Sequence, residues 1–268
     1  MSVTPTTWNP ADKHADLALT NGDKTATTDF WHFESVRSVF STSASDGFYW
    51  EITIGHIEGG LEPVSEVGVG TASVNLALQL GSTNQGWAYQ DDALTYHNGI
   101  VTSPVGAGFQ SNQIVMVALK IPNLWWGVQG TWVEGGNPSA GTGAQYTNLA
   151  GTIYAIACMR MYGTPGVNDI IQTANFGASA FAYTVPTGFQ SGFGAVVVPH
   201  TITASAGSNG SISPSGAVSV NDGNNQTFTI TPDAGYGVQN VLIDGYGIGA
   251  AASYQFTSVG SDHTISST

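Results

Sequence analysis

Short apolar runs, several with alternating apolar and polar residues, recur along this chain, and glycine, asparagine, serine or proline separates them, a pattern typical of β-strands joined by turns. In the run at residues 48–54, every second residue would face the same side of a sheet, so Glu51 and Thr53 would point outward. The buried face would consist of Phe48, Trp50, Ile52 and Ile54. Similar runs lie at residues 35–42, 66–71, 86–89, 113–120 and 123–127. Charged residues make up only 9% of the chain and good helix formers are scarce, so the predicted fold is all-β.

Residues 125–132 predict a β-hairpin, because Gly130 can adopt the positive φ that a tight turn needs. The three tryptophans in this segment are expected to fill a sandwich core. A sugar-stacking platform is the alternative, and it requires the rings to be exposed.

The 268-residue chain carries five Lys and Arg against 18 Asp and Glu, a formal charge of −13. A nucleic-acid backbone or an anionic lipid surface would be repelled, so no nucleic-acid partner is predicted. No apolar run reaches the roughly 18 residues of a membrane span, and the first residues lack the pattern of a secretory signal. The expectation is synthesis in the cytoplasm without membrane insertion, unless another machine exports the chain.

Cys158 is the single cysteine, so no intrachain disulfide can form, and its apolar neighbours predict a buried thiol. Composition changes near residues 193–201, where Ser, Gly, Asn and Thr become dominant. No Lys or Arg follows Arg160, which leaves the final 108 residues without a formal positive side chain. We predict a β-sandwich at residues 1–195 and a small β-rich domain at residues 196–268.

Compact active-site motifs for serine hydrolases, P-loop nucleotide binding and zinc proteases are absent from the sequence. The six histidines are dispersed and no two are four residues apart, which excludes a helix-borne metal pair and leaves open a site assembled by folding. We therefore predict no catalytic residue, no metal and no cofactor.

The acidic residues allow two further interpretations. Glu58, Glu62 and Glu66 are spaced four apart, but glycine and proline interrupt them, which favours a solvated acidic loop over a helical carboxylate face. Two carboxylates brought together by folding could hydrolyse a glycoside, and this stays a minority hypothesis. Residues 91–92 and 222–225 offer oxygen ligands for calcium, although bare turns are favoured there.

A series of short motifs follows along the first domain. The motifs are Trp8-Asn9-Pro10, residues 17–21, Ser35-Val36-Arg37-Ser38, Gly47-Phe48-Tyr49-Trp50-Glu51-Ile52, Val67-Gly68-Val69-Gly70, Gly86-Trp87-Ala88-Tyr89, Val117-Ala118-Leu119, residues 124–132, Ala174-Asn175-Phe176-Gly177 and residues 181–189. In this order they resemble the SPRY (B30.2-like) family over about residues 8–192. Residues 111–113 and 120–122 depart from the family's usual turn sequences. The resemblance implies a bent, concanavalin-like sandwich of antiparallel sheets that binds peptides or proteins through loops at one edge.

By this resemblance, the binding loops lie near residues 29–33, 75–82 and 162–168. An ordinary loop or core-edge role is the alternative at each position. The candidate ligand-binding residues are His32, Phe33, Leu76, Gln79, Ser82, Tyr162 and Val167.

A second series of motifs fills residues 201–268. It comprises Ile202-Thr203-Ala204, residues 210–216, residues 226–232, Ala234-Gly235-Tyr236, residues 241–245, Tyr254-Gln255-Phe256 and residues 263–266. These motifs resemble one divergent InlB B-type bacterial repeat. The resemblance implies a spacer or adhesion module of bacterial surface or phage proteins.

These observations favour a non-enzymatic bacteriophage virion protein, displayed on the virion surface as a capsid decoration or as a tail fibre or adhesion component. Its expected partners are virion proteins of the capsid or tail, and a host surface protein or glycan. A bacterial cell-surface adhesin or carbohydrate-binding module is the alternative. Assembly into a homo-oligomer stays open.

Overall fold

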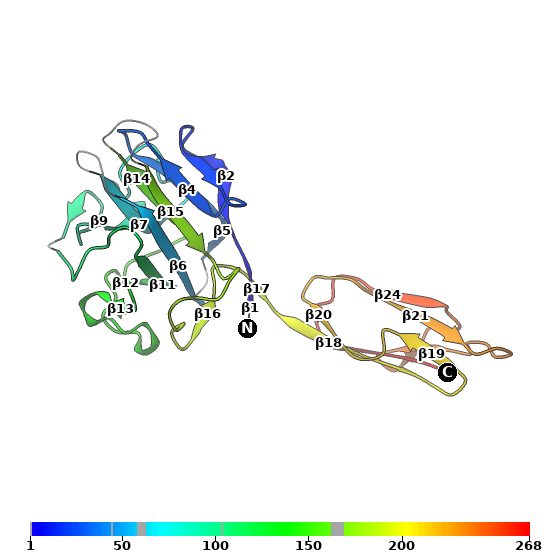
Figure 1. Ribbon diagram of the computed structural model, residues 1–268. Coiled ribbons are helices and arrows are strands. Elements are labelled where there is room, and N and C mark those ends of the chain that lie inside the picture. The colour runs from blue at the N-terminus through cyan, green and yellow to red at the C-terminus, as the bar shows by residue number, and fades with distance from the viewer. Residues whose placement is uncertain (1, 44, 58–62, 103, 162–168) are drawn as a thin grey trace. The chain divides into compact units, whose positions relative to one another are not determined.

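The computed structural model describes residues 2–43, 45–57, 63–102, 104–161 and 169–268. The chain forms two compact units, Met1–Val196 and Val197–Thr268, and both are built of strands and turns (Figure 1). Helical structure in the described ranges is limited to the single-turn 3-10 helices η1 (Val133–Gly135) and η2 (Pro138–Ala140). The all-β fold predicted from the sequence is confirmed. Neither of these helices has the length or apolar character needed to cross a membrane.

Two sheets, with mostly antiparallel pairing, form the first unit. Over the described residues, the first sheet runs in the order β13 (Thr131–Trp132), β12 (Asn123–Val128), β11 (Ile114–Lys120), β6 (Gly47–His56), β15 (Ile170–Asn175), β4 (Thr25–Thr28) and β3 (Ala18–Thr20). It also takes in β1 (Ser2–Pro5), β16 (Phe189–Ser191) and β17 (Gly194–Val197). The second sheet runs in the order β10 (Ile100–Val101), β9 (Thr95–His97), β8 (Gly86–Gln90), β7 (Val64–Gly70), β14 (Ile153–Arg160), β5 (Glu34–Thr42) and β2 (Trp8–Lys13).

The core of the first unit lies between these sheets and is built around β6. Trp50 pairs across the sheet with Val117, which in turn pairs with Trp126, so the three side chains form one row. The ring of Trp50 lies 4.8 Å from that of Phe193, measured between centroids. From the second sheet, Tyr89 stacks on Trp126 at 5.8 Å. All five side chains are at most 1% exposed, so these aromatic contacts join the two sheets.

The opposite face of β6 is also buried, which the sequence analysis did not expect. Glu51 does point away from the core, but it is only 3% exposed, whereas Thr53 is exposed. The carboxylate of Glu51 accepts hydrogen bonds from the backbone N–H groups of Ala182 and Tyr183, each at 2.9 Å. Glu51 therefore points outward as predicted, but it is shielded from solvent because the chain after β15 returns over this face. A buried carboxylate needs such donors.

The predicted hairpin at residues 125–132 is present. Strands β12 and β13 pair through Gly127 with Trp132 and Val128 with Thr131. The turn residues Gln129 and Gly130 both have positive φ, 49° and 84°, as a two-residue hairpin turn of this hand requires. Trp126 lies in the core between the sheets, as predicted. The prediction was wrong for the other two, because Trp125 is buried on the opposite face of β12 against Phe189 and Trp132 is only partly buried.

The second unit has its own small core between two sheets. The first contains β20 (Gly216–Asn221), β18 (Pro199–Ala206), β25 (His263–Ser267), β22 (Val241–Ile243) and β23 (Tyr246–Gly247). The second contains β19 (Gly210–Ser213), β21 (Gln226–Pro232) and β24 (Ser253–Phe256). Phe228 and Phe256 meet edge to face at 5.9 Å within this core, and Ile202 and Ile265 are fully buried beside them.

Replacement of Trp50 by alanine should lower the free energy of unfolding of the first unit by about 3–5 kcal/mol, because it leaves a large cavity between the sheets. All seven tryptophans lie before residue 197. Urea unfolding followed by tryptophan fluorescence therefore reports on the first unit alone.

Trp31→Ala is the matched control for this measurement, because Trp31 is 66% exposed and its loss should change the free energy of unfolding by less than about 0.5 kcal/mol. Equal losses in the two variants would contradict the assignment of Trp50 to the core.

Candidate functional site

Two loops predicted to bind ligand lie side by side at the outer face of the second sheet. One connects β4 to β5 and includes His32 and Phe33; the other connects β7 to β8 and spans residues 71–85. The backbone N–H of Ser35, the second residue of β5 (Glu34–Thr42), donates to the carbonyl of Leu76 at 3.0 Å, which ties the 71–85 loop to the strand that follows the first loop. Phe33 and Leu76 both pack against one small apolar cluster, and the structure thus brings these two predicted residues together.

That small cluster follows from strand alternation. On β14, Ala155 and Ala157 face the main core, whereas Ile156 and Cys158 face outward and are covered by the 71–85 loop. The loop lies close to the sheet because β7 offers no side chain at Gly70, where an added Cβ would meet Val74 at 2.6 Å. The loop's inner side is therefore packed, while Leu78 on its outer side is 46% exposed.

Glu66 is a buried carboxylate that holds the 71–85 loop on the sheet through hydrogen bonds. Its side chain is fully buried on the outer face of β7, and its two oxygens accept from Gln79 Nε2 at 2.8 Å and from the Leu80 N–H at 3.1 Å. Burial raises the pKa of the Glu66 carboxyl to about 7. Cys158 lies opposite on β14, and burial, together with the charge of Glu66, raises the pKa of its thiol. The thiol is accordingly predominantly protonated at neutral pH and is a poor nucleophile.

The remaining predicted contact residues have different surroundings. The side-chain amide of Gln79 is turned toward Glu66 and helps to hold its own loop on the sheet. Ser82 is exposed, and its N–H donates to the carbonyl of Gln79 at 3.1 Å. The last two predicted residues, Tyr162 and Val167, lie outside the described residues.

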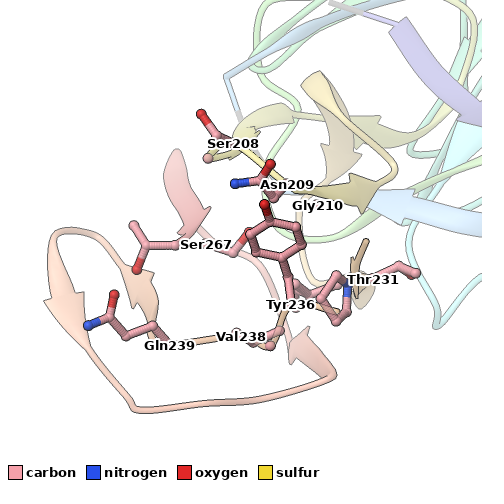
Figure 2. A pocket seen from close by; sticks show the side chains of 13 residues that line it. Ser208, Asn209, Gly210, Thr231, Tyr236, Val238, Gln239 and Ser267 are labelled. Atoms are coloured by element: carbon pink, nitrogen blue, oxygen red, sulfur yellow. The ribbon is translucent and has the colours of Figure 1, made fainter. Parts of the chain in front are cut away.

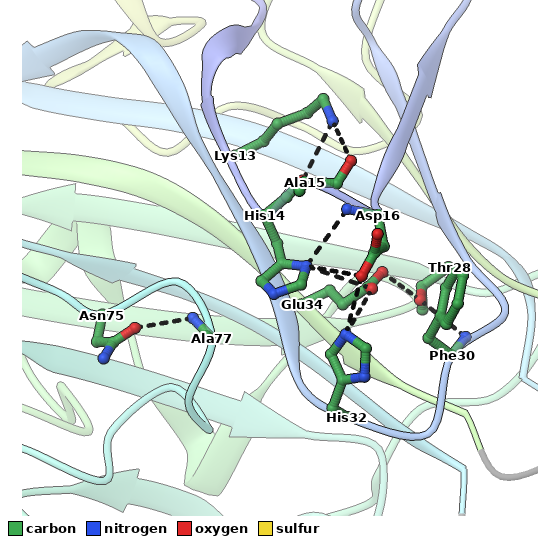
Figure 3. Close-up of polar contacts among 10 residues, drawn as sticks. All are labelled: Lys13, His14, Ala15, Asp16, Thr28, Phe30, His32, Glu34, Asn75 and Ala77. Atoms are coloured by element: carbon green, nitrogen blue, oxygen red, sulfur yellow. Dashed lines mark hydrogen bonds and ion pairs between the residues drawn. The ribbon is translucent and has the colours of Figure 1, made fainter.

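His32 belongs to a cluster of four metal-ligating side chains that the sequence analysis did not predict (Figure 3). His14 and Asp16 follow β2, while His32 lies in the loop before β5 and Glu34 is the first residue of that strand. In this view the two imidazoles and two carboxylates point toward one another. Oε1 of Glu34 lies 3.4 Å from His14 Nδ1 and 3.1 Å from His32 Nε2. Oδ2 of Asp16 lies 3.8 Å and 3.3 Å from the same two nitrogens.

Glu34 is the buried member of this cluster. Its side chain is fully buried, and its Oε2 accepts from the Thr28 hydroxyl. Its Oε1 faces the two imidazoles without a hydrogen-bond donor of good geometry in the described residues. Burial raises the pKa of the Glu34 carboxyl, and the nearby histidines oppose this effect.

A weak sequence signal did exist for the cluster. Both halves have the spacing His-x-acid, at residues 14–16 and at residues 32–34. The same spacing also occurs at residues 56–58, so the motif alone does not select the pair that folding brings together. Histidines four residues apart would mark a metal site on a helix. This cluster is instead assembled from residues beside the ends of two strands, β2 and β5.

The second unit contains a pocket beside Tyr236, which is 59% exposed (Figure 2). Hydroxyl and amide side chains line it, and no Asp, Glu, His, Lys or Arg is among the described lining residues. The polar side chains at its rim come from Ser208, Asn209, Gln239 and Ser267. The pocket offers hydrogen bonds and one aromatic face, without an acid–base pair.

Comparison with known proteins gives matches to solved structures alone, since no family model and no curated protein matches the chain. The SPRY domain of human HERC1 is 17% identical with a TM-score of 0.50, covering 62% of this chain and 96% of that one. The TRIM65 PSpry domain is 13% identical with a TM-score of 0.46, covering 65% of this chain and 93% of that one. A human SPRY domain is 13% identical with a TM-score of 0.44, covering 62% and 98%.

The chain therefore has a SPRY-like fold. The 62% of the chain that matches the HERC1 domain exceeds the whole length of the second unit, so the match must extend into the first unit. We call the first unit the SPRY-like unit below. The resemblance of residues 201–268 to the InlB B-type repeat is not tested by these matches and stays a prediction.

Glu66→Gln should flatten the pH dependence of stability of the SPRY-like unit. The folded pKa of Glu66, about 7, lies above its ordinary value of 4.5, so its contribution is favourable at low pH and is lost as pH rises through 7. Between pH 5 and 8, the wild type should lose on the order of 2 kcal/mol more than the variant. Urea unfolding at several pH values measures this difference.

Glu134→Gln is the control, because it removes one acidic charge at an exposed site. It should leave the wild-type pH profile in place. Parallel profiles for the wild type and Glu66→Gln would contradict the burial of an ionisable Glu66 beneath the loop.

Proposed function

We propose that the SPRY-like unit is a non-enzymatic recognition module that binds a protein segment at the surface of the 29–33 and 71–85 loops. The proposal rests on one observation: each loop has an apolar side chain that packs inward against the sheet and a second, large apolar side chain that is exposed to solvent. Phe33 and Leu76 pack inward against the small cluster, whereas Trp31 is 66% exposed and Leu78 is 46% exposed. Exposed large apolar side chains on loops that are themselves held in place are typical of binding surfaces.

The anchoring reduces the entropic cost of binding. Loops that are already ordered lose little conformational freedom when a partner docks, so more of the contact energy appears as affinity. Tryptophan is the residue type most enriched among side chains that dominate interface energies. The resemblance to the SPRY family, whose members generally bind peptides or proteins through such loops, supports the same interpretation.

The wider role that we propose is display on a bacteriophage particle, as a capsid decoration or a tail component that binds another virion protein or the host surface. The pairing of a SPRY-like unit with the InlB-like repeat that the sequence predicts supports this role. The strongly acidic composition also supports it, because a charge of −13 discourages adhesion to nucleic acid during assembly. A bacterial surface adhesin that binds glycans is the second candidate, favoured by the uncharged pocket beside Tyr236.

The binding surface can be tested with peptides selected from a displayed random-peptide library on the immobilised full chain. For a synthetic copy of a selected peptide, Trp31→Ala and Leu78→Ser should each raise the Kd at least about tenfold in calorimetry, as expected for central contact residues. Ile100→Ser is the control, because Ile100 is 63% exposed on β10, outside the two loops. Unchanged Kd values in both loop variants, or a library that yields no binder, would contradict the proposal.

The proposed display of the chain on a phage particle can be tested by immunogold electron microscopy of purified particles from a phage whose genome encodes the chain. The proposal predicts gold particles on the capsid or the tail. Absence from every purified particle would overturn the virion role, and labelling of the bacterial envelope would instead favour the adhesin.

A further inference from the structure

We infer that His14, Asp16, His32 and Glu34 form a binding site for one divalent transition-metal ion, with Zn²⁺ as the best-fitting member of the class. The donor set supports this choice. Two imidazole nitrogens and two carboxylate oxygens suit Zn²⁺ and its neighbours, whereas Ca²⁺ and Mg²⁺ prefer oxygen ligands alone and more of them. The inference stands on the cluster itself and does not depend on the proposed recognition function.

The spacing of the donor atoms fits a tetrahedral ion. Metal–ligand bonds of about 2.0–2.1 Å place neighbouring ligand atoms about 3.3 Å apart in a tetrahedron. The four nitrogen–oxygen distances across the cluster are 3.1, 3.3, 3.4 and 3.8 Å. All four ligand atoms lie within 4.8 Å of one another. Only small side-chain adjustments would therefore be needed to bind an ion.

The buried carboxylate gives a second, independent indication. Glu34 Oε1 has no well-aligned hydrogen-bond donor among the described residues, although its side chain is fully buried. A buried, partly unsatisfied carboxylate is costly, and a cation between it and the imidazoles would offset that cost. Its other oxygen, Oε2, accepts from Thr28, as the supporting contact of a metal-bound carboxylate commonly does.

The histidines also present suitable atoms. Nδ1 of His14 accepts only a long hydrogen bond of 3.4 Å from the Asp16 N–H, and an ion would take its single lone pair in place of this weak contact. The ammonium of nearby Lys13 is held by the backbone carbonyls of His14 and Ala15, at 3.1 and 3.2 Å (Figure 3). Lys13 therefore does not occupy the position between the carboxylates.

The ion would connect two segments that are distant in the sequence. His14 and Asp16 come from the turn after β2, while His32 precedes β5 and Glu34 begins it. Bonds from one ion to both pairs would hold the 29–33 loop against that turn. Because a metal that binds the folded state alone stabilises it, zinc should raise the melting temperature of the SPRY-like unit.

The test is titration of the full, chelator-treated chain with ZnCl₂ in competition with a chromophoric zinc indicator. We expect one equivalent of Zn²⁺ to bind, and His32→Ala and Asp16→Asn each to weaken that binding at least about tenfold. Asp16 is partly exposed, with 44% of its side chain accessible, so Asp16→Asn keeps the fold while removing one charged ligand. X-ray absorption of the zinc-loaded wild type should show a first shell of nitrogen and oxygen at about 2.0–2.1 Å.

His200→Ala is the matched control. It removes a histidine that lies 2.9 Å from Asp222 in the second unit, a His–Asp pair outside the cluster. This variant should bind zinc as the wild type does. Zinc affinity unchanged in both cluster variants, or absent from the wild type, would show that the four side chains form only ion pairs and would overturn the inference.

Discussion

From Gly47 to Ile52, strand β6 is buried on both faces, and this double burial shapes the SPRY-like unit. Its inward side carries Trp50, which joins the aromatic core, and its outward side carries Tyr49 and Glu51, which are also buried. An outward face with a carboxylate cannot simply be covered by apolar side chains, because the charge would lose its hydration without compensation. The returning chain at residues 181–183 supplies the two N–H groups that satisfy Glu51 and at the same time packs Phe181 against Tyr49.

The same solution recurs where loops cover the second sheet. Glu66 is buried on the outer face of β7 and binds the loop that covers it through the Gln79 amide and the Leu80 N–H. Glu34 is buried at the start of β5 and faces His14 and His32 across a short gap. Buried carboxylates thus hold the covering segments in place, because those segments donate hydrogen bonds to Glu51 and Glu66. These contacts connect the fold to the proposed function, because loops that are already ordered present Trp31 and Leu78 to a partner at a low entropic cost of binding.

The sequence predicted the parts of the fold that depend on local periodicity. Alternation at residues 48–54 identified the core face of β6, and Gly130 identified the turn of the β12–β13 hairpin. The SPRY-like sandwich followed from the order of short motifs. The burial of Glu51 could not be predicted, because it depends on a segment about 130 residues later in the chain returning over the strand. The sequence alone could not show that Gln79 faces a buried carboxylate. The cluster at His14 and His32 was missed for the same reason, since the two His-x-acid pairs become neighbours only when β2 and β5 pair.

The 29–33 and 71–85 loops form one ordered surface on the sandwich, and backbone amide hydrogen exchange of the full chain measures that order. The decisive amides are those of Ser35, which donates to Leu76, and Leu80, which donates to Glu66. We expect both amides to be protected to within about tenfold of the β7 and β14 amides, because opening the loops would expose a buried carboxylate and the small apolar cluster. Exchange of both amides at the rate of an unprotected chain, while β7 and β14 stay protected, would contradict it.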